Sequence, residues 1–175
     1  MPDPTIFHAE AEEAVISAVL VNPELIDYLD LRADEFYIGK NKTIWHAVTD
    51  LARARARLQT HWQTALEDGQ PFEDKDDASP VTAIDRAIER ELREAIARHT
   101  PSFGVVGEEY PDHQRDAEYS WVLDPIDGTK AFIAGVPVYG TLIALCRDGR
   151  PVLGVVDLPI AGLRWVGVEG QPTRL

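Results

Sequence analysis

Apolar residues in the first 66 positions recur three, four and seven residues apart, which is the spacing of an amphipathic helix. Asn22-Pro23 interrupts this pattern, because a residue that precedes proline avoids the helical region of backbone space. A longer amphipathic stretch follows at residues 42–66. Its apolar positions are Ile44, Val48, Leu51, Leu58 and Trp62. The pattern therefore predicts a helical segment over residues 1–66.

The spacing changes after the loop signal Asp68-Gly69-Gln70-Pro71. Residues 82–98 again repeat as a helix, and beyond them the apolar residues approach the alternation of strands. Asp148-Gly149 indicates a tight hairpin turn. The expected strands are 103–106, 120–123, 138–146, 151–156 and 163–168. We therefore predict an α+β fold: the helical segment 1–66, then a mainly antiparallel sheet with flanking helices in residues 67–175.

The charge balance narrows the classes of partner. The 175 residues include 17 Lys and Arg against 30 Asp and Glu, a formal net charge of −13. Such a chain is unsuited to broad contact with nucleic acid or anionic membranes, but it leaves room for cation binding. It has one cysteine, lacks a secretory signal at its start, and has no apolar run of the ~20 residues that cross a bilayer. We expect a cytoplasmic protein without direct nucleic-acid or membrane binding.

The densest group of candidate functional residues is the motif DPIDGT at 124–129, which follows an apolar strand. One turn presents both Asp124 and Asp127, and carboxylates are ligands that Mg²⁺ prefers. A helix beginning after that turn offers backbone N–H groups to a phosphate oxygen. These features indicate a metal-assisted phosphate hydrolase. The alternative is a purely structural turn, since Asp-Pro and Asp-Gly are common turn dipeptides.

Two further acidic positions precede this motif. Glu108 follows the expected strand 103–106 within a Gly-Glu-Glu sequence, so it is a second carboxylate at a strand end. Asp85 stands three residues after Thr82, where a helix begins. Each has a structural alternative: a solvated loop for Glu108, and a capping box with Thr82 for Asp85.

Taken in order, EDK…SPVT..D, GEE and WVLDPIDGT resemble the inositol monophosphatase family of Mg²⁺-dependent phosphatases, over roughly residues 72–170. The stretch 139–167 is most similar to the histidinol-phosphatase branch. The resemblance implies that Glu108, Asp124 and the backbone carbonyl of Ile126 hold a first metal ion. Asp124 would also bridge to a second ion, which Asp127 binds.

The same resemblance implies catalytic roles. Asp85 and Thr129 would orient the attacking water, and the backbone N–H groups of Gly128 and Thr129 would bind the substrate phosphate. Lys75 would be a supporting charge near the metal ions. Family members carry a further metal-binding Asp in a Trp-Asp motif of their C-terminal half, and this sequence contains no Trp-Asp pair. We therefore expect hydrolysis of histidinol phosphate or an inositol or sugar phosphate to be weak or absent.

Residues 9–51 resemble a different family, the N-terminal domain of DnaB-type replicative helicases. The matching features are AE.EAV, NPE, D.FY and an Ile-Trp pair. The resemblance implies self-association and no chemistry, and the sequence has no phosphate-binding GxxxxGK[ST] loop. We expect a homo-oligomer formed through residues 1–66. A non-catalytic binding module and a non-functional composite fragment stay open as alternatives to the phosphatase.

Overall fold

The computed structural model describes residues 58–60, 72–74, 80–170 and 172–173, all within a compact unit that spans Ala54–Leu175. The predicted helical segment 1–66 lies outside the described residues except at 58–60, which are helical and include the fully buried Leu58. Lys75 also lies outside them. Within the described part of the chain, no helix is long and apolar enough to cross a membrane.

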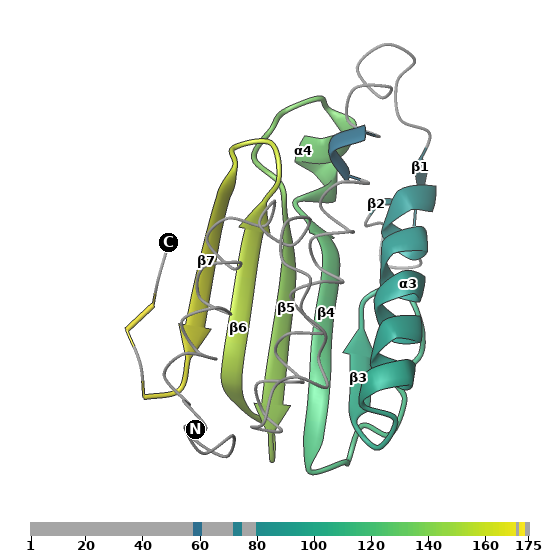
Figure 1. Cartoon of the computed structure of the whole chain (residues 1–175). Coiled ribbons are helices and arrows are strands. Elements are labelled where there is room, and N and C mark those ends of the chain that lie inside the picture. Colours follow the sequence, from purple (N-terminus) through teal and green to yellow (C-terminus); the bar gives the residue numbers. More distant parts are fainter. Residues whose placement is uncertain (1–57, 61–71, 75–79, 171, 174–175) are drawn as a thin grey trace, which may run out of the picture. The chain divides into compact units, whose positions relative to one another are not determined.

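Five strands form one sheet in the order β3-β4-β5-β6-β7 (Figure 1). β3 runs parallel to β4, and every other neighbouring pair is antiparallel. The strands are β3 (Gly104–Gly107), β4 (Tyr119–Asp127), β5 (Gly140–Arg147), β6 (Arg150–Leu158) and β7 (Leu163–Val168). The predicted α+β class and mainly antiparallel sheet are confirmed.

Two helices and a small hairpin accompany the sheet. α3 (Ala83–His99) packs against β4, and Figure 1 shows it running alongside β3. α4 (Thr129–Ile133) follows directly after β4. β1 (Phe72–Asp74) pairs with β2 (Pro80–Thr82), and β2 contacts both α3 and α4. The hairpin thus connects the start of α3 to the end of β4.

The core lies between α3 and one face of the sheet. α3 buries its apolar stripe, and the Trp121 indole N–H donates to the Thr100 hydroxyl at the end of the helix, at 3.2 Å. Cross-strand register places the buried sheet residues on one face, because directly paired residues point to the same side. The buried residues of that face are Trp121, Leu123, Ile143, Leu145, Leu153, Val155 and Val166.

The turn between β5 and β6 is the two-residue hairpin that the sequence predicted. Arg147 pairs with Arg150, and the two residues between them have positive φ, 48° at Asp148 and 75° at Gly149. This combination is typical of a type I′ turn, whose twist matches that of the flanking strands. The prediction is confirmed, and the turn fixes the register of β5 against β6.

A buried ion pair joins β6 to β7. Asp157 and Arg164 are direct cross-strand partners, and the Arg164 Nε lies 2.7 Å from a carboxylate oxygen of Asp157. Only 1% of each side chain is exposed. Burying two charges costs several kcal/mol per ion unless they are well paired. The stability of this end of the sheet therefore depends on both partners being present.

We expect Arg164→Met to lower the free energy of unfolding by about 3–5 kcal/mol, because it leaves the Asp157 carboxylate buried without its cation. The double variant Asp157→Leu/Arg164→Met should recover most of that loss, since neither charge remains. Urea denaturation measures both, with Arg150→Met at the exposed start of β6 as the control. Equal losses in the single and double variants would contradict this account.

Candidate active site

The end of β4 contains a β-bulge that brings two predicted ligands to one side. Asp124 pairs with Leu142 and Asp127 with Gly140, so three steps along β4 match two along β5. Side chains alternate along a strand, and residues three apart would otherwise face opposite sides. The extra residue in the bulge places both side chains on the same side of the sheet, where the Asp127 charge acts on Asp124. The Thr141 hydroxyl donates to the Pro125 carbonyl at 2.8 Å and satisfies a polar group inside the bulge.

Asp124 is the centre of the predicted site. Burial raises the pKa of its carboxyl from 3.8 to about 7, with further contributions from the charge and hydrogen bond of Glu108 and the charges of Asp127 and Asp85. The structure therefore brings Glu108, Asp127 and Asp85 within electrostatic range of Asp124. The Oδ1 atom of Asp124 is buried and has no hydrogen-bond partner among the described residues.

Glu108 reaches this position because β3 and β4 are parallel. Gly107 pairs with Leu123, so the residues that follow each strand emerge at the same edge of the sheet. Glu108 directly follows β3, and Asp124 directly follows the paired residue of β4. The Glu108 carboxylate thus lies close enough to act on Asp124, through a parallel strand pair that the sequence analysis did not foresee.

Asp85 has the capping role that the sequence indicated. Its carboxylate accepts hydrogen bonds from the Thr82 backbone N–H at 2.8 Å and from the Thr82 hydroxyl, forming the capping box that starts α3. Asp85 is 1% exposed, so this geometry is fixed. Its charge nevertheless contributes to the raised pKa of Asp124. The cap is confirmed, and the role in orienting water stays a prediction.

The turn after β4 carries the remaining predicted residues. Gly128 precedes α4 with a φ of 89°, a left-handed conformation that glycine adopts at little cost. The Thr129 hydroxyl donates to the Ile126 carbonyl at 2.9 Å, while the Ile126 side chain is buried in the core. A carbonyl oxygen has two lone pairs, and this hydrogen bond uses one of the two acceptor positions of the Ile126 oxygen.

The donor set fits a hard divalent cation. Carboxylate and carbonyl oxygens are the ligands of Mg²⁺, and a buried carboxylate oxygen without a donor lies at the centre of the cluster. Burial and the neighbouring negative charges together raise the pKa of Asp124, and a cation bound there would offset those charges. As they stand, no three Asp, Glu, His or Cys side chains in the described part of the chain form a complete metal site.

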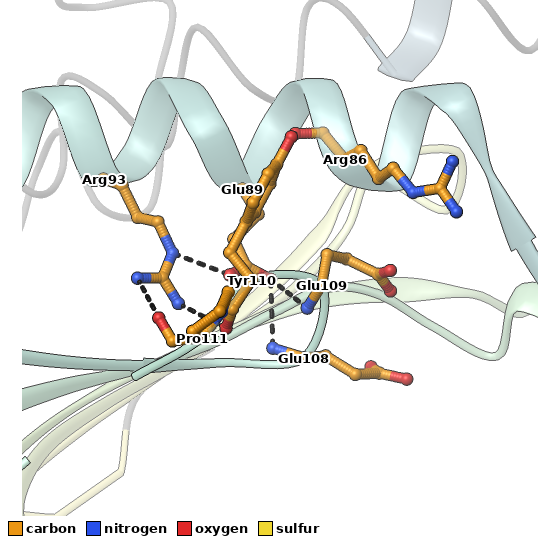
Figure 2. Close-up of polar contacts among 7 residues, drawn as sticks. All are labelled: Arg86, Glu89, Arg93, Glu108, Glu109, Tyr110 and Pro111. Atoms are coloured by element: carbon orange, nitrogen blue, oxygen red, sulfur yellow. Dashed lines mark hydrogen bonds and ion pairs between the residues drawn. The ribbon is translucent and has the colours of Figure 1, made fainter. Parts of the chain in front are cut away.

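Sequence reasoning missed two residues that shape this site, Thr141 and Glu89. Thr141 supports the bulge, and the fully buried Glu89 accepts the backbone N–H of Glu108 at 3.0 Å (Figure 2). The signal for Glu89 was available, because it lies beside Ile88 on the buried side of α3. A carboxylate at a core position of an amphipathic helix requires buried partners.

Comparison with known proteins places this site in a family. The model of the inositol monophosphatase family matches residues 34–175. The bifunctional phosphatase IMPL2 of Arabidopsis thaliana is 50% identical over 104 residues, which cover 58% of this chain and 30% of that protein. The histidinol-phosphatase of Mycobacterium tuberculosis is 45% identical over 97 residues, or 55% of this chain and 37% of that protein.

Comparison with solved structures finds the same fold in related proteins. The extragenic suppressor protein suhB of Bartonella henselae superposes with a TM-score of 0.64 at 26% identity, covering 70% of this chain and 47% of that one. The inositol monophosphatase of Thermotoga maritima gives 0.63 at 28% identity, covering 70% and 46%. The chain thus spans about a third of these curated relatives and about half of the solved chains.

The resemblance of residues 9–51 to a helicase domain is not supported. The family match begins at residue 34 and so includes the second half of that segment. The resemblance depended on four short motifs, and amphipathic helices of the kind that carry them occur in unrelated helical domains. The non-catalytic interpretation that depended on it loses its support as well. The chain belongs to the inositol monophosphatase family.

Proposed function

We propose that this chain carries out Mg²⁺-dependent hydrolysis of a phosphate monoester, with histidinol phosphate or an inositol phosphate as substrate. The observation that carries the proposal is a group of four carboxylates, in which three act on Asp124 where β3 and β4 end. The Oδ1 atom of Asp124 is buried and has no hydrogen-bond partner among the described residues. Relatives named histidinol-phosphatase and inositol-1-monophosphatase support this class of substrate.

The chain's own residues supply the cation ligands. Glu108, Asp124, Asp127 and the Ile126 carbonyl would hold Mg²⁺, with Asp124 central because the other charges act on it. When bound, the cation would offset the negative charge of the substrate phosphate and make the attacking water more acidic.

Asp85 and Thr129 are suited to orienting that water. The Asp85 carboxylate is held in place by Thr82, and an ionised carboxylate can accept a proton from water. The Thr129 hydroxyl gives its hydrogen to the Ile126 carbonyl, which leaves its oxygen as an acceptor. β2 leads directly into α3 and contacts α4, so these two residues belong to helices that both adjoin β2.

The turn before α4 is suited to the substrate phosphate. The first N–H groups of a helix have no acceptor within the helix and point outward from its start. The left-handed Gly128 directs the chain from the end of β4 into that start. We propose that the backbone N–H groups of Gly128 and Thr129 bind a phosphate oxygen.

The first prediction concerns metal binding. Mg²⁺ at ten times its dissociation constant should stabilise the protein by about 1.4 kcal/mol, because it binds only the folded state. For a chain of this size that corresponds to a rise of about 3–5 °C in the melting temperature. Asp124→Asn should abolish the rise, whereas Asp116→Asn in an exposed loop should keep it. A rise that persists in Asp124→Asn would place the cation elsewhere.

The second prediction concerns pH. The pKa of Asp124 is raised in the folded protein from 3.8 to about 7, so without metal the folded state binds the extra proton. Its contribution to stability is present at low pH and is lost as the pH rises from about 4 to 7. In EDTA, Asp124→Asn should match the unsubstituted protein near pH 4 and exceed it in melting temperature at pH 8. The opposite order at pH 8 would exclude a raised pKa.

The third prediction concerns catalysis. Phosphate release from histidinol phosphate should require Mg²⁺ and fall about 10²–10⁴-fold in Asp85→Asn, because the group that accepts the proton is lost. Thr82→Ala tests the cap separately: it should lower stability by about 0.5–2 kcal/mol yet keep Mg²⁺-dependent release. Release measured without Mg²⁺, or at an undiminished rate in Asp85→Asn, would refute the proposed mechanism.

A further inference from the structure

Glu89 is a buried carboxylate that accepts three hydrogen bonds. Its side chain is fully buried on α3. One oxygen, Oε2, accepts the backbone N–H groups of Glu108 at 3.0 Å and Glu109 at 2.7 Å, and Oε1 accepts the Arg93 Nε at 2.7 Å (Figure 2). Three donors require two acceptor oxygens, which a carboxylate offers and an amide does not.

Arg93 extends the same attachment along the loop. Its Nη1 donates to the Pro111 carbonyl at 3.1 Å and its Nη2 to the Tyr110 carbonyl at 3.0 Å. The guanidinium carbon also lies 5.8 Å from the centre of the Tyr110 ring. Glu89 and Arg93, which we call the clamp, thus hold the N–H groups of Glu108 and Glu109 and the carbonyls of the two residues that follow them, all in the first part of the loop.

Gly107 makes this close approach possible. A Cβ atom at this position would lie 2.0 Å from the Glu89 Oε1 and 2.7 Å from the Arg93 Nη2. Both atoms are held by hydrogen bonds, so neither can retreat without breaking one. The last residue of β3 therefore has to be glycine for the clamp to form.

The clamp fixes the backbone of Glu108, whose side chain acts on the other side of the loop. Figure 2 shows the Glu108 side chain extending away from Glu89, and the charge and hydrogen bond of Glu108 act on Asp124. Glu108 is exposed, so core packing does not set its direction. The hydrogen bond to the Glu108 N–H group therefore helps to set the direction of the Glu108 carboxylate.

We propose that Glu89 is a positioning residue that, together with Arg93, directs Glu108 toward the Asp124 cluster for cation binding; this rests on the proposed metal-dependent function. Partners of metal ligands that lie one contact away from the ion typically change its affinity about 10–100-fold when substituted. A residue that only stabilised α3 would change the melting temperature without changing cation affinity in the folded protein.

The first part of the test uses the full chain without metal. Amide hydrogen exchange followed by NMR should show that the Glu108 and Glu109 N–H groups are protected, although both belong to a loop. Glu89→Gln should remove that protection, and Glu94→Gln, an exposed glutamate on the same helix, should keep it. Rapid exchange of both amides in the unsubstituted protein would overturn the proposal without reference to any variant.

The second part measures the dissociation constant of Mn²⁺ from the free-ion signal in electron paramagnetic resonance. Glu89→Gln should weaken binding about 10–100-fold, and Glu94→Gln should leave it unchanged. Unchanged affinity in Glu89→Gln would overturn the positioning role alone. If the unsubstituted protein binds no Mn²⁺, the proposed function fails and this inference with it, so the two failures are distinguishable.

A second variant covers the case in which Glu89→Gln does not fold. Gly107→Ala keeps every charge but places a methyl group where the clamp lies, so it should reproduce the loss of amide protection and of Mn²⁺ affinity. Gly154→Ala on β6 is the matched control, because a Cβ there meets nothing within 4 Å. Mn²⁺ affinity equal in these two glycine variants would contradict the proposal.

Discussion

Mutual repulsion among Asp85, Glu108, Asp124 and Asp127 is the constraint that the fold has to overcome. Burial of the Asp124 carboxyl is the largest cause of its raised pKa, and the nearby charges of Glu108, Asp127 and Asp85 raise that pKa further, because like charges at short range destabilise one another. Three elements bring in the four carboxylates: the start of α3, the end of β3, and β4, which supplies one from each side of its bulge. The surrounding structure offsets this cost with hydrogen bonds that hold the backbone near these carboxylates in place.

Much of that fixing comes from polar groups buried behind the site. Thr82 holds Asp85, Thr141 satisfies the bulge, and Glu89 holds the loop after β3. Buried hydrogen bonds of this kind are strong because little water competes for them, and costly to break because a group left unpaired stays desolvated. The order of the four carboxylates therefore depends on these buried hydrogen bonds.

The sequence predicted the elements well and their pairing less well. Strand β7 has the predicted bounds, and the capping box at Asp85 is confirmed, because both depend on local spacing. The bulge beside Asp127 depends on a one-residue offset against another strand, which no local pattern contains. Glu89 was missed because a charged helix residue is normally solvent-facing, although its place beside Ile88 on the amphipathic helix was a signal that it is buried. The helicase resemblance is not supported, because a few short motifs on amphipathic helices do not distinguish one helical family from another.

The connection from β3 to β4 leaves the site at Glu108 and re-enters the sheet at Tyr119, at the far end, because parallel strands begin at the same edge. A bridge between Val105 and His113 anchors its first part, and residues 114–116 beyond that bridge are exposed. Insertions and deletions at 114–116 would lengthen or shorten this excursion without moving either carboxylate. Evolution can therefore remodel this outer loop, and with it the surface that other molecules meet, independently of the chemistry at the opposite edge.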